Sequence, residues 1–205
     1  GYYLISAILQ IKERELMSKD QRLARLKKVL SKVSEIADGL NHPSTFRIKD
    51  LLFRSDVLIP TKESVQSTRQ TSLPFSILPL VPEDKVNYPH LEGFFRMLGG
   101  KEGASASALY NFEIKTIVVL FQHWQSEEYL ASVLMHEAVH AMQNSEPQSL
   151  DELSQSELGA YLVHFEIMDY IGEKNPRYKI AVKEEGLWAL GLYKATGKYP
   201  GLDYV

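Results

Sequence analysis

The stretch that decides the fold is SEEYLASVLMHEAVHAM, residues 126–142, whose apolar periodicity predicts a buried helix. Ser126 is a suitable N-cap, and the two glutamates after it stand in the first turn, where carboxylates interact favourably with the helix dipole. His136 and His140 are one turn apart, so their Cβ atoms lie about 5–6 Å apart on one face. Glu137 is rotated by about 100° from His136 around the helix axis. Two imidazoles therefore project together from an apolar helix, with a carboxylate beside them.

This His-Glu-x-x-His pattern indicates a zinc site. Zn–N bonds are about 2.0–2.1 Å long, so both rings can reach one ion. Glu137 cannot easily join them on that ion, but it can reach a water bound to the ion, where a general base must stand. Residue frequencies alone produce the pattern about once per hundred chains of this size, so the pattern is suggestive only. Burying these three side chains without partners would cost several kcal/mol, which a metal offsets.

A catalytic zinc ion takes three protein ligands and keeps a fourth position for water, so a third ligand must lie elsewhere. Glu146 has the spacing found where the third ligand follows a helix-ending glycine, but Gln143 occupies that glycine's position. Residues 149–172 predict another helix, which opens with a capping box that uses Glu152. On this helix Glu157 is the one carboxylate centred in an inward-facing stripe. The other residues of the stripe are Leu150, Leu153, Ala160, Tyr161, His164, Met168 and Ile171.

The segments before the motif predict a small sheet. Residues 114–122, IKTIVVLFQ, form the strongest strand pattern in the chain. Residues 46–60 predict a short pair of strands, and residues 60–89, which hold five of the nine prolines, predict a long surface loop. The small-residue segment 99–108 is expected to be a connection, because its glycines lack the Lys-Ser/Thr of a phosphate-binding loop. The expected fold class is α+β, mainly helical with a small sheet.

Residues 9–40 predict one long amphipathic helix that ends at Gly39 and the following NHP, with an apolar residue at every seventh position. Such a repeat suits a coiled coil that binds a partner or a helix packed on its own domain. We prefer the second, because Lys12 and Lys19 interrupt the seam. We therefore expect a helical extension, residues 1–42, packed on a domain formed by residues 43–205.

The opening stretch, residues 1–9, is too short for a membrane span, which needs about 20 apolar residues. It is either the buried first turn of a helix or the remnant of a removed signal or anchor. We expect no membrane span in this chain. The cellular location stays open, with an exported protein slightly favoured.

Composition narrows the classes of function. The 205 residues include no cysteine, which excludes disulfides, cysteine-ligated zinc and thiol catalysis. The net charge is −3, and basic residues alternate with acidic ones instead of forming a patch, so nucleic acid is not an expected partner. At 44% apolar residues, the chain is long enough for one domain with a substantial core.

HEAVH at 136–140 and ELGAY at 157–161 together resemble the gluzincin zinc metallopeptidases, the group that includes thermolysin. The resemblance covers roughly residues 105–172 and implies a zincin-like domain with a strand at the cleft edge, an active-site helix and a glutamate helix. It implies that His136, His140 and Glu157 bind one Zn²⁺ and that Glu137 activates the zinc-bound water. It also implies that the strand at 114–122 pairs with an extended peptide substrate.

One position departs from this group. Thermolysin-like enzymes have an aspartate four residues after the ligand glutamate, where it orients a histidine, and Tyr161 stands at that position here. Tyr161 and His164 are candidates for stabilising the transition state or for hydrogen bonding beside the metal ligands. The alternative for each is a packed aromatic ring or a buried histidine with no role in the reaction.

The resemblance implies a zinc-dependent metallopeptidase that acts on a peptide or protein substrate. Two alternatives remain: a catalytically inactive module in which zinc staples two helices and the N-terminal helix binds a partner, and a zinc hydrolase that is not a peptidase. Structural zinc sites are normally closed by four protein ligands. Only three are visible in the sequence, which favours catalysis.

Overall fold

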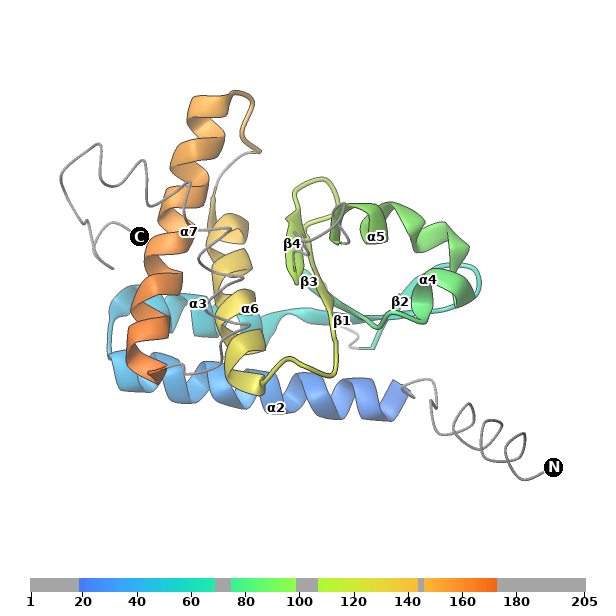
Figure 1. Cartoon of the computed structure of the whole chain (residues 1–205), viewed down its shortest axis with the longest axis horizontal. Coiled ribbons are helices and arrows are strands. Elements are labelled where there is room, and N and C mark those ends of the chain that lie inside the picture. The colour runs from blue at the N-terminus through green and yellow to red at the C-terminus, as the bar shows by residue number, and fades with distance from the viewer. Residues whose placement is uncertain (1–18, 69–74, 99–106, 144–145, 173–205) are drawn as a thin grey trace.

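The structure is a computed structural model that describes residues 19–68, 75–98, 107–143 and 146–172. These residues form an α+β fold, as the sequence predicts (Figure 1). The helices are α2 (Lys19–Leu40), α3 (Pro43–Arg54), α4 (Asp84–Asn87), the 3₁₀ helix η1 (Pro89–Leu91), α5 (Glu92–Leu98), α6 (Glu127–Met142) and α7 (Leu150–Ile171). The strands are β1 (Asp56–Pro60), β2 (Val65–Ser67), β3 (Ser76–Leu80), β4 (Ala108–Asn111) and β5 (Thr116–Leu120).

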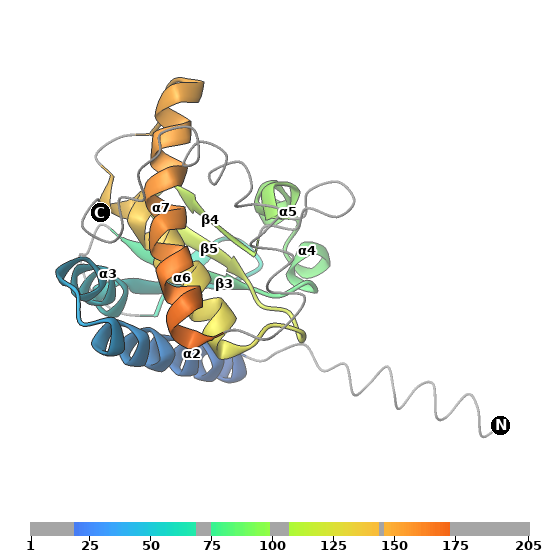
Figure 2. The ribbon, with the colours of Figure 1, turned by 60° about the vertical axis from the view of Figure 1, so that its left-hand side comes forward.

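The five strands form one mixed sheet in the order β2-β1-β3-β5-β4. The three inner strands, β1, β3 and β5, run parallel, while β2 and β4 pair antiparallel at the two edges. The sheet lies between α6 on one face and the α4–α5 segment on the other (Figures 1 and 2). Because both faces are covered, β5 is apolar along most of its length instead of alternating with polar residues.

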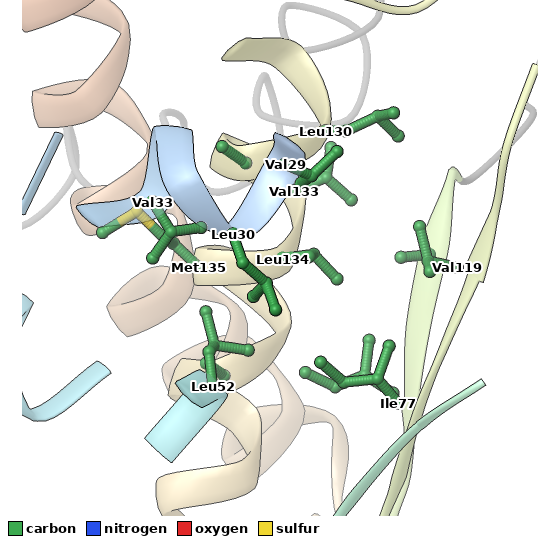
Figure 3. Close-up of a cluster of buried hydrophobic side chains, with 14 of the residues drawn as sticks. Val29, Leu30, Val33, Leu52, Ile77, Val119, Leu130, Val133, Leu134 and Met135 are labelled. Carbon is green, nitrogen blue, oxygen red and sulfur yellow. The ribbon is translucent and has the colours of Figure 1, made fainter. Parts of the chain in front are cut away.

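The main hydrophobic core surrounds α6, which has buried residues on all its sides. A helix with this pattern must be enclosed by other elements. Figure 3 shows the enclosure: α2 and α3 approach one side of α6, and the sheet approaches another. The labelled residues are Val29, Leu30, Val33, Leu52, Ile77, Val119, Leu130, Val133, Leu134 and Met135. A second cluster joins the other face of β3 and β5 to η1 and α5.

Two sequence predictions before the motif are wrong. Residues 46–54 are helical rather than a strand, because the proline-led segment after His42 starts α3 and buries Ile48 and Leu52 one turn apart. His42 caps this helix by accepting a hydrogen bond from the amide of Ser44. The predicted surface loop at 60–89 contains β2, β3 and α4, and β3 lies in the centre of the sheet.

The N-terminal helix is described from Lys19 onward, so the predicted start at residue 9 lies outside the described residues. The helix ends at Leu40, where Asn41 adopts a left-handed conformation with a φ of 50°. Its apolar face belongs to the same core as α6. The division of the chain at residue 42 stays a prediction.

A buried ion pair ties α2 to the start of α4, and a hydrogen bond from the same arginine reaches β3. Both guanidinium nitrogens of Arg22 donate to the carboxylate of Asp84, at 2.6 and 3.0 Å, and Nη1 also donates to the carbonyl of Pro79 at 2.7 Å. The same carboxylate accepts from the amide of Val81 at 2.9 Å. Because each partner satisfies the other away from water, loss of one leaves a buried charge without compensation.

We expect Arg22→Met to lower the free energy of unfolding by about 3–5 kcal/mol, because Asp84 would remain buried and unpaired. Urea unfolding measures this loss. Lys28→Met, on the exposed face of the same helix, is the matched control. Equal midpoints for the two variants would contradict the prediction, and Arg22→Met combined with Asp84→Leu should recover much of the stability.

No helix among the described residues is both long enough and apolar enough to cross a membrane.

Candidate metal centre

Three side chains predicted as metal ligands converge between α6 and α7. The Nε2 atom of His136 lies 3.5 Å from one carboxylate oxygen of Glu157, and the Nε2 atom of His140 lies 3.5 Å from the other. The ligand atoms of all three residues lie within 4.8 Å of one another. Both histidines come from α6 and the glutamate from α7, which pack along each other (Figures 1 and 2).

Side-chain caps define where these two helices begin. Ser126 accepts from the amide of Tyr129 at 3.1 Å and begins α6, and Ser149 accepts from the amide of Glu152 at 3.2 Å and begins α7. Both caps agree with the sequence prediction. Gly159 faces the Val139 side chain, where an added Cβ atom would make an ordinary contact at 4.0 Å. The two helices therefore pack against each other through this segment.

The ring of His140 is held from the side opposite Glu157. Its Nδ1 atom lies 3.0 Å from the hydroxyl of Ser156 and 3.2 Å from the side-chain oxygen of Gln143. The Ser156 hydroxyl donates to this Gln143 oxygen at 2.6 Å, and the Gln143 amide donates to the Ser156 carbonyl at 3.1 Å. No role for either residue was predicted from the sequence, although Ser156 adjoins Glu157. Such outer contacts set the tautomer and orientation of a metal-binding histidine.

The ring of His136 is enclosed by two residues of α7. Its Nδ1 atom lies 3.3 Å from Nδ1 of His164, and its ring meets the Tyr161 ring edge-on with centroids 4.6 Å apart. Both α7 residues are buried. The structure therefore brings Tyr161 and His164, the two further candidates from the sequence, next to His136, a candidate metal ligand.

The remaining candidate carboxylates differ in their exposure to solvent and in their position relative to the cluster. Glu137 is only 8% exposed and lines the same cavity as the three ligand residues. Glu146 and Glu152, the alternative third ligands, are exposed and lie outside the cluster of ligand atoms. Leu153, which was predicted in the inward stripe, lines the cavity but is 40% exposed. The reason is that the first turns of α7 extend beyond the end of α6 (Figure 1).

A cavity of about 720 Å³ opens over the cluster. Its walls are α6, α7, the segment before α7, and β4 with its flanking residues. The residues of this last wall are Ser107, Ala108, Leu109, Tyr110 and Phe112. One expectation is wrong here: β5 is an inner strand between β3 and β4, so β4 and not residues 114–122 forms the edge beside the cavity. The short strand β4 was not predicted from the sequence, because it begins at the end of the small-residue segment.

The cluster is electrostatically coupled. Burial alone lowers the pKa of His140, but the hydrogen bond to Glu157 and the charges of Glu137 and Glu157 outweigh it and raise this pKa to about 9. Burial alone raises the pKa of Glu157, yet hydrogen bonds to both histidines hold it well below its ordinary value. Without a metal, the pair therefore prefers a protonated imidazole facing an ionised carboxylate.

This coupling predicts how metal binding depends on pH. A metal needs the neutral imidazole, so the proton on His140 must leave, and affinity for Zn²⁺ should rise about tenfold per pH unit below the pKa of His140. The rise should level off near pH 9, the pKa of this group. Competition titrations against a chelator between pH 6 and pH 9 measure the slope. An affinity that does not change across this range would contradict the prediction.

The donor set fits zinc. Two imidazole nitrogens and one carboxylate oxygen are a zinc combination that leaves a position for water, whereas Mg²⁺ and Ca²⁺ prefer oxygen ligands throughout. Both histidines have Nε2 towards Glu157 and Nδ1 engaged by another side chain. The chain thus offers three oriented donors from two rigid helices.

Comparison with family models, with curated proteins and with solved structures found no match for this chain.

Proposed function

We propose that this protein is a zinc-dependent metallopeptidase, with His136, His140 and Glu157 as the zinc ligands and Glu137 as the general base. The observation that carries the proposal is the convergence of the three ligand atoms within 4.8 Å in the wall of a large cavity. Glu137, directly after one ligand, lines that cavity too and takes no place among the ligand atoms. Its carboxylate is therefore free to act on a water or a substrate.

The chemistry divides between the ion and the chain. Bound zinc supplies a Lewis acid and makes a water more acidic at neutral pH. Glu137 accepts a proton from the attacking water and passes it to the leaving amine, a task that needs a carboxylate within hydrogen-bonding reach of both. The low exposure of Glu137, 8%, keeps that carboxylate out of bulk solvent.

The cavity suits a peptide. Its volume of about 720 Å³ lies within the range for ligand sites, and aromatic rings from Tyr110, Phe112 and Tyr129 line it. Strand β4 has a sheet partner on one side only among the described strands. Its other edge can pair with an extended chain by backbone hydrogen bonds. This strand edge favours a peptide or protein substrate over a small hydrolysable molecule.

A zinc-stapled module without activity has less support. Structural zinc sites are commonly closed by four protein ligands, and the described residues supply three to the cluster. The adjoining cavity, which a closed staple does not need, also favours catalysis.

Incubation of the zinc-loaded protein with a diverse peptide library, read by mass spectrometry, tests the proposal. Cleavage that a chelator abolishes and added zinc restores is the expected result. About one zinc per chain without cleavage would instead support the stapled module. Cleavage that survives removal of all metal would overturn the zinc mechanism.

A further inference from the structure

Two side chains of α7 contact the two ring nitrogens of His136. Glu157 approaches its Nε2 atom at 3.5 Å, and His164, two helical turns further along the same face, approaches its Nδ1 atom at 3.3 Å. Residues seven apart on an α-helix share a face, so one straight helix can carry both contacts. Helix α7 therefore supplies the described partner of each ring nitrogen of His136.

We propose that His164 is the positioning residue for the ligand His136, an inference that rests on the proposed zinc site. A histidine that binds metal through Nε2 in its neutral form carries its proton on Nδ1. Among the described residues, the Nδ1 atom of His164 lies 3.3 Å from the nitrogen that carries this proton and accepts the hydrogen bond, so His164 carries its own proton on Nε2. The hydrogen bond fixes both the tautomer and the plane of the His136 ring.

This arrangement uses a neutral partner where a carboxylate commonly stands. Metal-binding histidines usually donate their second N–H to a carboxylate, a backbone carbonyl or water. Tyr161, four residues after Glu157, packs its ring edge-on against His136 with centroids 4.6 Å apart. The accepting atom comes from one turn further along α7. His164 is 4% exposed, so bulk water does not readily take over this contact.

The second histidine of the proposed site, His140, also has neutral partners at Nδ1. His140 meets a hydroxyl and an amide oxygen at its Nδ1 atom, both uncharged. Neither ligand histidine thus has a described carboxylate at Nδ1. The negative charge around the cluster comes from Glu137 and Glu157, which lie on the cavity side.

Three full-length variants test the role of His164 through zinc affinity. His164→Leu removes the acceptor and should weaken zinc binding about 10–100-fold, as loss of an outer partner typically does. His164→Asn offers a side-chain oxygen close to the position of Nδ1 and should restore most of the affinity. Val163→Ala, a buried neighbour that does not line the cavity, should lower stability without changing affinity. Wild-type affinity in His164→Leu, or an equal loss in His164→Asn, would overturn the inference.

Long-range ¹⁵N NMR of the imidazoles in the wild-type protein supplies a readout that does not need zinc. A hydrogen bond between the two Nδ1 atoms requires a proton on one of them and none on the other. Protons on both, or on neither, would overturn the inference. A protein that shows the single proton but binds no zinc would refute the zinc proposal and leave the histidine pair standing. Chemical shifts from the zinc-loaded protein should assign the proton to His136.

Discussion

Glu137→Gln should keep its zinc and lose peptide hydrolysis by about 100- to 10,000-fold, the usual contribution of a general acid–base residue. The amide has nearly the same shape as the carboxylate, so it disturbs the packing little, but it cannot take a proton from water. Because Glu137 lies outside the group of ligand atoms, zinc affinity should stay close to wild type. Turnover of a cleaved library peptide and zinc content of the same preparation measure the two effects.

The matched control is Glu128→Gln, the same chemical change at the start of the same helix. Glu128 interacts with Lys32 at 3.7 Å and does not line the cavity. Its activity should equal that of wild type. If Glu137→Gln cleaves as fast as this control, the base lies elsewhere. If it also loses its zinc, Glu137 belongs to the ligand set and the division of roles proposed above is wrong.

Glu157→Gln should lower zinc affinity by about 100-fold or more, beyond the loss expected for a residue that only orients a ligand. In the proposed site, this side chain supplies the single anionic donor and the only ligand atom from α7 among the described residues. Two neutral imidazoles from one helix would remain. A metal that binds the folded state stabilises it, so zinc should raise the melting temperature of wild type but hardly that of the variant.

Glu166→Gln, on the same helix but outside the cavity lining, is the control for this second variant. Zinc content by elemental analysis should remain about one per chain in the control and fall in Glu157→Gln. Unchanged zinc in Glu157→Gln would mean that another residue is the third ligand. In that case Glu146, which lines the cavity, is the next to test.

The central residues of the candidate site were predictable, because their spacing along one helix can be read directly from the sequence. The one-turn spacing of His136 and His140 and the cap at Ser126 are features within a single helix, and the structure has both. Glu157 was predictable because a lone carboxylate in an apolar stripe needs a partner. Its distance from the histidines was not, since it depends on how α6 and α7 cross.

The errors share one physical origin. Residues 46–54 have little intrinsic preference, and burial of Ile48 and Leu52 against the core decides for a helix. Residues 75–80 combine a proline with apolar residues, and pairing on both sides makes residues 76–80 an inner strand. Ser156 and Gln143 gain their role only when α7 lies beside α6. Each outcome depends on contacts between segments distant in sequence.

By itself, the sequence determined which side chains can share a helix face: the two histidines with their neighbouring glutamate on α6, and Glu157 with His164 on α7. Helical geometry sets these relations within a few residues, so they need no knowledge of the rest of the chain. Only the tertiary structure decided that the two faces meet with the Nε2 atoms 3.5 Å from the carboxylate, and that β4 forms the cavity edge. Both outcomes depend on how the helices pack and on the order of the strands. That arrangement is set by contacts throughout the hydrophobic core, between segments far apart in the sequence.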